Sequence, residues 1–245
     1  KKATTMRIVR CAIEGYFEKN DSPLIFKFDE RARYQITSSE EEEPQMSLED
    51  LMKMLTIGKP SITQKAVLLC KFHRGLDTST TVDRFNFQAW EQLVDYFGTE
   101  QYVKWDLTLC PAPITLTRIK TDYTHLGFLD VDAVQSLQDY LDYRFKKTGK
   151  PMQQGEPLFL NSRNLTISDF WIRQSFKRLA NTSGIQHKLK REGIMPKYQK
   201  DSHELRDLLK STLIDCGTRI DVADHVIGHK PKDSYEKQST LYPET

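Results

Sequence analysis

Residues 201–216 read DSHELRDLLKSTLIDC and form the stretch that best indicates the fold. Apolar residues recur there every three or four positions, which predicts an amphipathic helix over residues 202–216. His203 and Arg206 are three residues apart at the start of this helix, so their side chains are expected on the same face. Taken alone, such a pair also fits an ordinary solvent-facing surface. The buried stripe is expected to consist of Leu205, Leu208, Leu209, Leu213 and Ile214.

Helical patterns continue on both sides of this stretch. Ser47, with Asp50 three residues later, resembles the capping box that starts a helix. Gly98 follows an apolar helical pattern and is the residue type that commonly ends one. Asp130 is expected to cap the start of another helix. The further helices are expected over residues 47–55, 61–73, 87–97, 131–145, 168–180 and 219–227.

Between the helices the pattern changes to β-branched and aromatic residues. Strands are expected over residues 103–109, 114–119 and 123–129. Lys120-Thr121-Asp122 would form a tight turn between the last two strands. The sequence therefore predicts a mainly α fold with a small antiparallel β-sheet (α+β).

The first 42 residues differ in character from the rest. Residues 3–19 show a helical pattern, whereas the acidic run Glu40–Glu43 indicates a loop or linker. We therefore expect two parts, residues 1–42, which are too short to form a domain, and residues 43–245, which form the main domain. Because the chain begins with Lys1 and not with Met, it is expected to be a trimmed or processed product or the ordered part of a longer protein.

The composition excludes membrane proteins and disulfide-rich secreted domains. Hydrophobic residues make up 38% of the chain and charged residues 29%, and no apolar run has the length of a membrane span. A cytoplasmic protein is therefore expected. The four cysteines are far apart and form no Cys-x-x-Cys pair, which indicates reduced, mostly buried thiols and no metal site. They are Cys11, Cys70, Cys110 and Cys216.

The basic residues are unevenly distributed, although the net charge is only +2. Between residues 171 and 200, eight basic side chains face a single acid, Glu192. Such a face could neutralise DNA phosphates, and it also fits an ordinary solvated helix and loop. The eight are Arg173, Lys177, Arg178, Lys188, Lys190, Arg191, Lys197 and Lys200.

Further candidate residues occur in a fixed order around the His-x-x-Arg pair. Arg74 ends an expected helix and has Asp77 three residues later, and Lys120 lies in the expected turn. His229 follows the last expected helix, and Tyr235 comes six residues after it. The ordered set Arg, Lys, His-x-x-Arg, His and Tyr resembles the tyrosine recombinase family, which includes phage integrases and the Xer, Cre and Flp enzymes. The resemblance extends from about Ser47 to the C-terminus and is closest to integrases of archaeal mobile elements.

The resemblance implies a site-specific DNA recombinase, or integrase, that cleaves and rejoins DNA through a 3′-phosphotyrosyl intermediate without a metal or other cofactor. Arg74 and Arg206 would hold the scissile phosphate, since planar guanidinium groups suit its non-bridging oxygens. His203 would act in general acid or base catalysis and Lys120 as the general acid. The remaining implied roles are support of the phosphate or the tyrosine by His229 and nucleophilic attack by Tyr235.

The resemblance also implies the domain roles and the partners. Residues 43–245 would be the catalytic domain, and residues 1–42 the end of a helical core-binding domain with its linker. The partner would be a double-stranded DNA attachment site. The protein would assemble as a tetramer on DNA and be a monomer or weak oligomer when free, associated with the nucleoid in the cytoplasm.

Several alternatives stay open. The Arg-x-x-acid relation to Asp77 favours Arg74 as the first arginine, with Arg84 as the fallback, although Arg74 could simply form a salt bridge with Asp77 or cap its helix. Tyr235 follows the second histidine more closely than is usual in the family, so Tyr242 is the alternative nucleophile. His225 and His229 could form a chance metal pair. The alternative functions are a non-cleaving DNA-binding regulator on the same fold and a type IB-like topoisomerase. His73, His125 and His187 are expected to be structural or surface residues.

Overall fold

The computed structural model describes residues 46–186 and 200–230, the strands Lys188–Leu189 and Lys197–Tyr198, and the isolated residues Tyr16, Lys19 and Asn20. The chain divides into two compact units, Lys1–Pro44 and Gln45–Thr245. Nearly all of the first unit lies outside the described residues, so the interpretation of residues 1–42 stays a prediction. In the part of the chain that is described, no helix is both long and apolar enough to cross a membrane.

Two capped helices open the second unit. Helix α3 (Leu48–Thr56) begins with the expected capping box, in which Ser47 Oγ accepts from the N–H of Asp50 (3.1 Å) and the Asp50 carboxylate accepts from the N–H of Ser47 (3.2 Å). Helix α4 (Ile62–His73) has a second capping box, between Ser61 and Gln64. Both helices are therefore confirmed.

A single helical run from residue 78 to residue 97 follows α4, and it begins earlier than expected. Asp77 caps α5 (Thr78–Thr80), which continues through a π-helical turn, η1 (Thr81–Phe85), into α6 (Asn86–Phe97). The run ends at Gly98 as predicted. Its threonine-rich start lacks an apolar helical pattern, which is why residues 78–86 were not expected to be helical.

Two of the three expected strands are present. β1 (Ala112–Arg118) pairs with β2 (Tyr123–Leu129) in an antiparallel sheet whose register runs from Ala112 opposite Leu129 to Arg118 opposite Tyr123. The connecting turn includes Asp122 with a φ of 48°. This arrangement confirms the tight turn and the small antiparallel sheet.

The prediction of a strand over residues 103–109 is wrong. Two 3₁₀ turns, η2 (Tyr102–Lys104) and η3 (Leu107–Leu109), occupy this stretch. Asp106 bends the chain by accepting a hydrogen bond from the N–H of Thr108 (2.9 Å), and Trp105 is buried against Trp90 and Phe97. The aromatic residues thus serve packing and not strand pairing.

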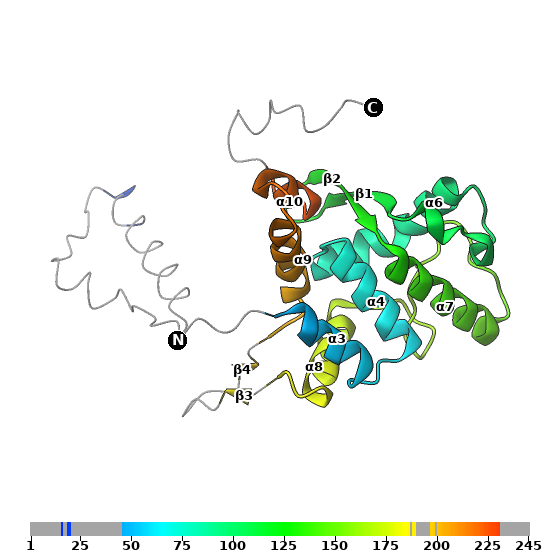
Figure 1. Cartoon of the computed structure of the whole chain (residues 1–245), viewed down its shortest axis with the longest axis horizontal. Helices are drawn as coiled ribbons and strands as arrows, with labels where there is room; N and C mark the ends of the chain where they lie inside the picture. Colours follow the sequence, from blue (N-terminus) through cyan, green and yellow to red (C-terminus); the bar gives the residue numbers. More distant parts are fainter. Residues whose placement is uncertain are drawn as a thin grey trace. The chain divides into compact units, whose positions relative to one another are not determined.

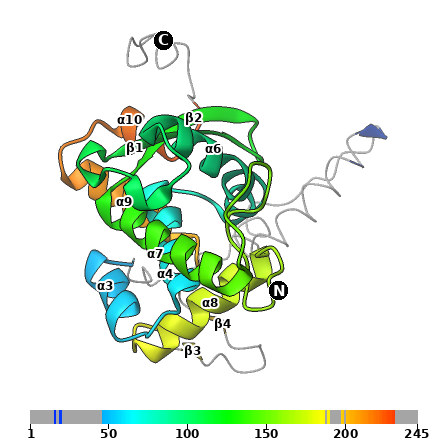
Figure 2. The same ribbon diagram turned by 90° about the vertical axis from the view of Figure 1, so that its right-hand side faces the viewer.

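The helices of the C-terminal half match the expected ones closely. Asp130 caps α7 (Val131–Thr148), Ser168 caps α8 (Asp169–Thr182), and His203 precedes α9 (Glu204–Asp215). The last described helix is α10 (Ile220–Val226), which lies beside α9 and β2 in Figures 1 and 2. A second sheet that was not expected pairs β3 (Lys188–Leu189) with β4 (Lys197–Tyr198).

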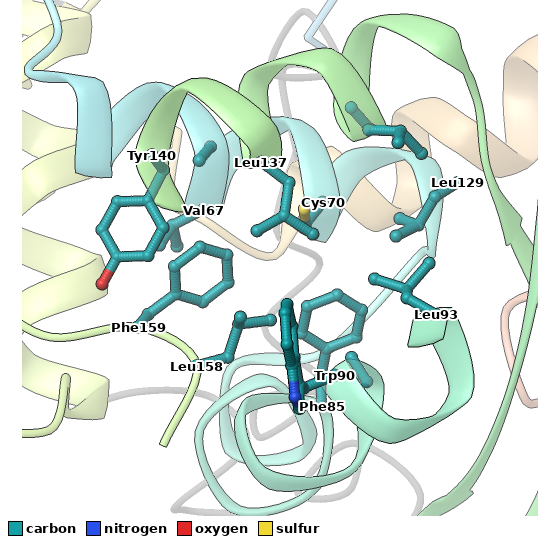
Figure 3. Packing of buried hydrophobic residues seen from close by; sticks show 14 of the residues in the cluster. Val67, Cys70, Phe85, Trp90, Leu93, Leu129, Leu137, Tyr140, Leu158 and Phe159 are labelled. Atoms are coloured by element: carbon teal, nitrogen blue, oxygen red, sulfur yellow. The ribbon is translucent and has the colours of Figure 1, made fainter. Parts of the chain in front are cut away.

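The hydrophobic core lies on both sides of α4. On one side α4 packs against α7 and β2 in a cluster to which α6 and β1 also contribute, and Figure 3 shows Val67 and Cys70 facing this cluster with Phe85, Leu137 and Phe159. The residues on its other side pack with α3, α8 and α9. Helix α4 is therefore central, and its C-terminal end is held between the sheet and the last helices.

Candidate functional site

Arg74 follows the last residue of α4 and is 0% exposed. Its Nε donates to the carbonyl oxygen of Ile114 (3.0 Å), its Nη2 to that of His125 (2.7 Å) and its Nη1 to that of Val226 (3.0 Å). Burial and the neighbouring Arg206 lower the pKa of Arg74 to about 9, so the group is charged at neutral pH. A single guanidinium group thus joins α4 to both strands and to α10. At 0% exposure it presents no donor at the surface, and the direct phosphate contact expected from the sequence stays a prediction.

The carboxylate of Asp77 is bonded to Arg118 and not to Arg74. Arg118 Nε donates to Asp77 Oδ2 (2.8 Å), and Arg118 Nη1 donates to the carbonyl oxygen of Gly228 (3.3 Å). Asp77 Oδ1 accepts from the N–H of Thr80 (2.8 Å). Burial raises the pKa of Asp77, but the hydrogen bonds from Arg118 and Thr80 outweigh it and lower the pKa to about 2. The alternative of an Arg74–Asp77 salt bridge is therefore wrong.

Arg206 lies on the first turn of α9 and is 1% exposed. Its Nη1 donates to the carbonyl oxygen of Gly75 (3.2 Å), whereas its buried Nη2 has no acceptor among the described residues. Burial and Arg118 lower the pKa of Arg206 to about 10, and Asp77 opposes this shift. A buried donor without an acceptor costs roughly 1–3 kcal/mol, so this position favours an additional acceptor such as an anionic oxygen.

His229 lies at the exposed edge of this cluster, directly after Gly228. Its Nδ1 is 2.6 Å from Asp224 Oδ1, to which Lys210 Nζ also donates (2.7 Å). Burial and Arg206 lower the pKa of His229 although Asp224 raises it, so the ring is neutral at pH 7. In the neutral ring Nδ1 donates to the carboxylate, which leaves the lone pair on Nε2. His229 can therefore accept a proton or a hydrogen bond at Nε2.

Two further histidines lie beneath the cluster. His125 is 2% exposed, and burial, followed by Arg74, lowers its pKa to about 3, so the ring is neutral. Its ring lies so close to Gly228, which has a φ of 75°, that a Cβ there would come within 2.6 Å of it. His225 Nδ1 is 2.8 Å from the hydroxyl of Tyr123. His125 is thus a structural residue, as expected.

The alternative of a metal pair formed by His225 and His229 is not supported, because the two rings have different partners. Within residues 46–186 and 200–230, no group of three or more His, Cys, Asp or Glu side chains is placed to hold a metal ion. The expectation of mostly buried thiols is correct for Cys70, whereas Cys110 is half-buried and Cys216 is exposed. Cys11 lies outside the described residues.

The remaining predicted site residues are exposed or not described. Lys120 is exposed in the turn between β1 and β2, and His203 is exposed at the start of α9. Arg84, the fallback for the first arginine, is exposed in the π-helical turn. Tyr235 and Tyr242 lie outside the described residues, so the identity of the nucleophile stays a prediction.

Arg118 was not recognised from the sequence as a candidate site residue. In β1, burial alternates so that residues 112, 114, 116 and 118 are buried, and Arg118 takes the last inward position. An arginine in an inward position needs an acid partner, and Asp77 provides it. The alternation was available as a signal, but it identifies Arg118 only when the strand bounds and register are known.

The basic segment over residues 171–200 only partly forms an open basic face. Lys200 is 6% exposed and bonded to Asp50 (2.7 Å), which contradicts its assignment to that face. Arg173 is 61% exposed, 3.6 Å from Asp169. Lys190 and Arg191 lie outside the described residues. An open depression of about 480 Å³ lies beside α8, and its lining includes Arg163, Phe170 and Arg178 but none of the predicted site residues.

The cluster as a whole carries an excess of positive charge. Lys71 is fully buried with Nζ donating to the carbonyl oxygen of Leu76, and burial lowers its pKa to about 8. Together with the three arginines, four cationic side chains thus converge from α4, β1 and α9. Among the described residues, the carboxylate of Asp77 is the one that forms a hydrogen bond with a member of this group, Arg118. Such a cluster can attract a phosphate group and stabilise charge that develops on it.

Comparisons with known proteins identify the fold. No protein-family model matches the sequence, and no curated protein matches it either. The structure is similar to XerA recombinase (TM-score 0.53, 16% identity), covering 77% of this chain and 57% of that chain. It is also similar to lambda integrase residues 75–356 in a dimer bound to a COC′ core site, with a TM-score of 0.58 and 17% identity. That similarity covers 97% of this chain and 73% of the lambda integrase chain. The Tn1549 transposon integrase in complex with transposon right-end DNA is similar with a TM-score of 0.58 and 15% identity. That similarity covers 89% of this chain and 69% of the Tn1549 integrase chain.

At such identities the similarity shows the fold alone. This chain has the fold of tyrosine recombinases and integrases, mainly helical with a two-stranded antiparallel sheet, which confirms the fold class expected from the sequence.

Proposed function

We propose that this chain is the catalytic part of a tyrosine site-specific recombinase, an integrase that cleaves and rejoins DNA. The observation that carries the proposal is the convergence of Arg118, Arg206 and His229 from β1, α9 and the segment after α10, with one buried guanidinium nitrogen lacking an acceptor. A scissile phosphate would supply that acceptor. The fold supports the proposal, since solved structures with it include recombinases and integrases.

The chemistry divides into two balanced transfers. The phenol oxygen of Tyr235 forms a bond to the phosphorus, and the bond from phosphorus to the 5′ oxygen breaks, which gives a 3′-phosphotyrosyl link and a free 5′-hydroxyl. The phenol proton passes to a base, for which His203 is proposed, and Lys120 protonates the leaving 5′ oxygen. In the reverse transfer a 5′-hydroxyl attacks and the tyrosine is released. One phosphoester replaces another in each step, so no nucleotide is consumed.

The surrounding residues suit these roles. Lys120 and His203 are exposed, so both can reach a DNA strand laid over the buried cations. His229 is fixed by Asp224 and can support the tyrosine or the phosphate at Nε2. Arg206 binds a non-bridging phosphate oxygen in this proposal. The same role expected for Arg74 stays a prediction, although each of its three nitrogens already donates to a main-chain carbonyl oxygen.

The proposed partner is a double-stranded DNA attachment site, with assembly of protomers into a tetramer on DNA. Support comes from two solved structures of similar fold, a lambda integrase dimer bound to a core site and a lambda integrase tetramer bound to a Holliday junction. Residues 43–245 would be the catalytic domain, and residues 1–42 the end of a core-binding domain. A mobile element of an archaeon, with the protein acting on the nucleoid, is the setting that the sequence resemblance favours.

The test is covalent capture. The chain is incubated with a pool of nicked duplexes of randomised core sequence and with DNA that flanks its gene, and SDS-resistant adducts are detected. We expect an adduct with the wild type, none with Tyr235→Phe, and normal yield with Tyr242→Phe. If no adduct forms on any duplex, the proposal fails.

Two other results would assign a different function. Salt-dependent DNA binding with no adduct would indicate a non-cleaving regulator. Relaxation of supercoiled plasmid without sequence preference would indicate a type IB-like topoisomerase.

A further inference from the structure

Two arginines, Arg74 and Arg118, lie beside Arg206, and either could be the second arginine that binds the scissile phosphate if the proposed function holds. Two guanidinium groups are useful on one phosphate, because negative charge grows on two non-bridging oxygens during the transfer. Arg206 supplies one. The neighbouring arginines are Arg74 and Arg118, and their bonding differs in a way that separates their tasks.

Arg74 is committed to the fold. Each of its nitrogens donates to a main-chain carbonyl oxygen, those of Ile114, His125 and Val226. The backbone also closes over it, since a Cβ on Gly127 would come within 2.8 Å of its Cζ. Nη1 and Nη2 each carry a second N–H, but the side chain is 0% exposed and could turn toward a ligand only by breaking bonds to three separate elements. Arg74 therefore holds β1, β2 and α10 in register.

Arg118 is held in place and still has donors to offer. Its Nε is bonded to Asp77, a carboxylate that is itself fixed by capping α5, and its Nη1 lies 3.3 Å from the carbonyl oxygen of Gly228. No described residue accepts from its Nη2. Such preorganisation is what a phosphate-binding group requires, because it removes the cost of ordering the side chain.

Arg118 also faces the same space as Arg206 and His229. Its Nη1 donates to the carbonyl oxygen of Gly228, the residue before His229. Its positive charge lowers the pKa of both Arg206 and His229. At 8% exposure it is nearer to solvent than Arg206 at 1%, and it directly precedes the turn that carries Lys120. Arg118 is thus the outer guanidinium group of the pair and Arg206 the inner one.

We propose that Arg118, positioned by Asp77, is the second arginine that binds the scissile phosphate, and that Arg74 is a positioning residue which holds the surrounding main chain. The chain would then have moved one phosphate-binding guanidinium group from the end of α4 to the end of β1. The pair Asp77–Arg118 joins the two elements.

The experiment uses a suicide duplex whose scissile phosphate is either native or a methylphosphonate, which lacks one negatively charged oxygen. The variants are Arg118→Ala, Arg74→Lys and Arg163→Ala, the last being a matched control because Arg163 is exposed and has no assigned role at the site. Loss of one preorganised donor typically lowers the rate about 100–1,000-fold. We expect such a loss for Arg118→Ala on the phosphate, recovery to within about 10-fold of wild type on the methylphosphonate, and no change for Arg163→Ala.

Three results would overturn the proposal. Wild-type rates for Arg118→Ala on the phosphate would show that the group is not needed. Loss on both substrates, with normal DNA binding and melting temperature, would show that it does not act through the phosphate charge. Rescue of Arg74→Lys, and not of Arg118→Ala, by the methylphosphonate would return the role to Arg74.

A wild-type chain that forms no adduct would sink the recombinase proposal, and the site is then judged by anion binding. Inorganic phosphate should raise the melting temperature of wild type and of Arg163→Ala but not of Arg118→Ala. An equal rise in Arg118→Ala would refute the phosphate-binding role by itself.

Discussion

Replacement of Arg74 by methionine tests the structural role assigned to this arginine. The substitution removes the donors of three main-chain carbonyls, those of Ile114, His125 and Val226. An unsatisfied buried acceptor costs about 1–3 kcal/mol. Relief from the burial of a positive charge offsets part of that cost, so we expect a loss of about 3–5 kcal/mol in the free energy of unfolding. Domains are typically stable by about 5–15 kcal/mol, so the variant would be close to unfolding.

The measurement is urea denaturation followed by tryptophan fluorescence, with Trp90 and Trp105 as buried reporters. Arg84→Met is the matched control, because Arg84 is exposed, and it should stay within about 0.5 kcal/mol of wild type. Arg74→Lys keeps the charge but not the planar guanidinium group, so most of the decrease in unfolding free energy expected for Arg74→Met should appear in it as well. If Arg74→Met changes the unfolding free energy by less than about 1 kcal/mol, the three hydrogen bonds do not hold the fold and the reasoning is refuted.

Three further outcomes are expected. Gly127→Ala should lower the unfolding free energy by about 1–3 kcal/mol in urea denaturation, because its Cβ would meet Arg74; unchanged stability would contradict this packing. Burial raises the pKa of Glu204 to about 7, so the free energy of unfolding of the wild type should fall as the pH rises from about 4 to 7. Glu204→Gln should lack this fall when denaturation is measured across the same pH range. Equal pH dependence in the wild type and the variant would contradict the raised pKa. Asp224→Asn should lower the pKa of His229 further, measured by NMR titration, since Asp224 raises it; an unshifted titration would show that the pair is not formed.

The local signals in the sequence predicted most of the helical framework. The capping residues Ser47, Asp130 and Gly98 marked helix ends that the structure confirms, because a cap is decided by contacts within one turn. The apolar stripe beside Arg206 likewise predicted a buried face on α9, which is correct for Leu205, Leu208 and Leu209, whereas Leu213 and Ile214 are half-buried. The stretch around Trp105 was misjudged, since its aromatic residues pack against another helix and its backbone follows Asp106.

The site was harder to predict because its bonds join residues far apart in the sequence. Asp77 is three residues from Arg74, which suggested a pair, yet its partner Arg118 is 41 residues away. That partner can be recognised only when β1 is placed against α5. Arg74 was singled out from the sequence, but its burial follows from the closure of β1, β2 and α10 around it, which no local pattern records.

The most direct test of the recombinase assignment is mass spectrometry of the protein after reaction with the nicked duplexes and digestion of both protein and DNA. A nucleotide attached through a 3′-phosphate to the peptide that contains Tyr235 is the predicted result. A nucleotide attached to any other residue, or its complete absence from a chain that binds the duplex, would contradict the proposed chemistry.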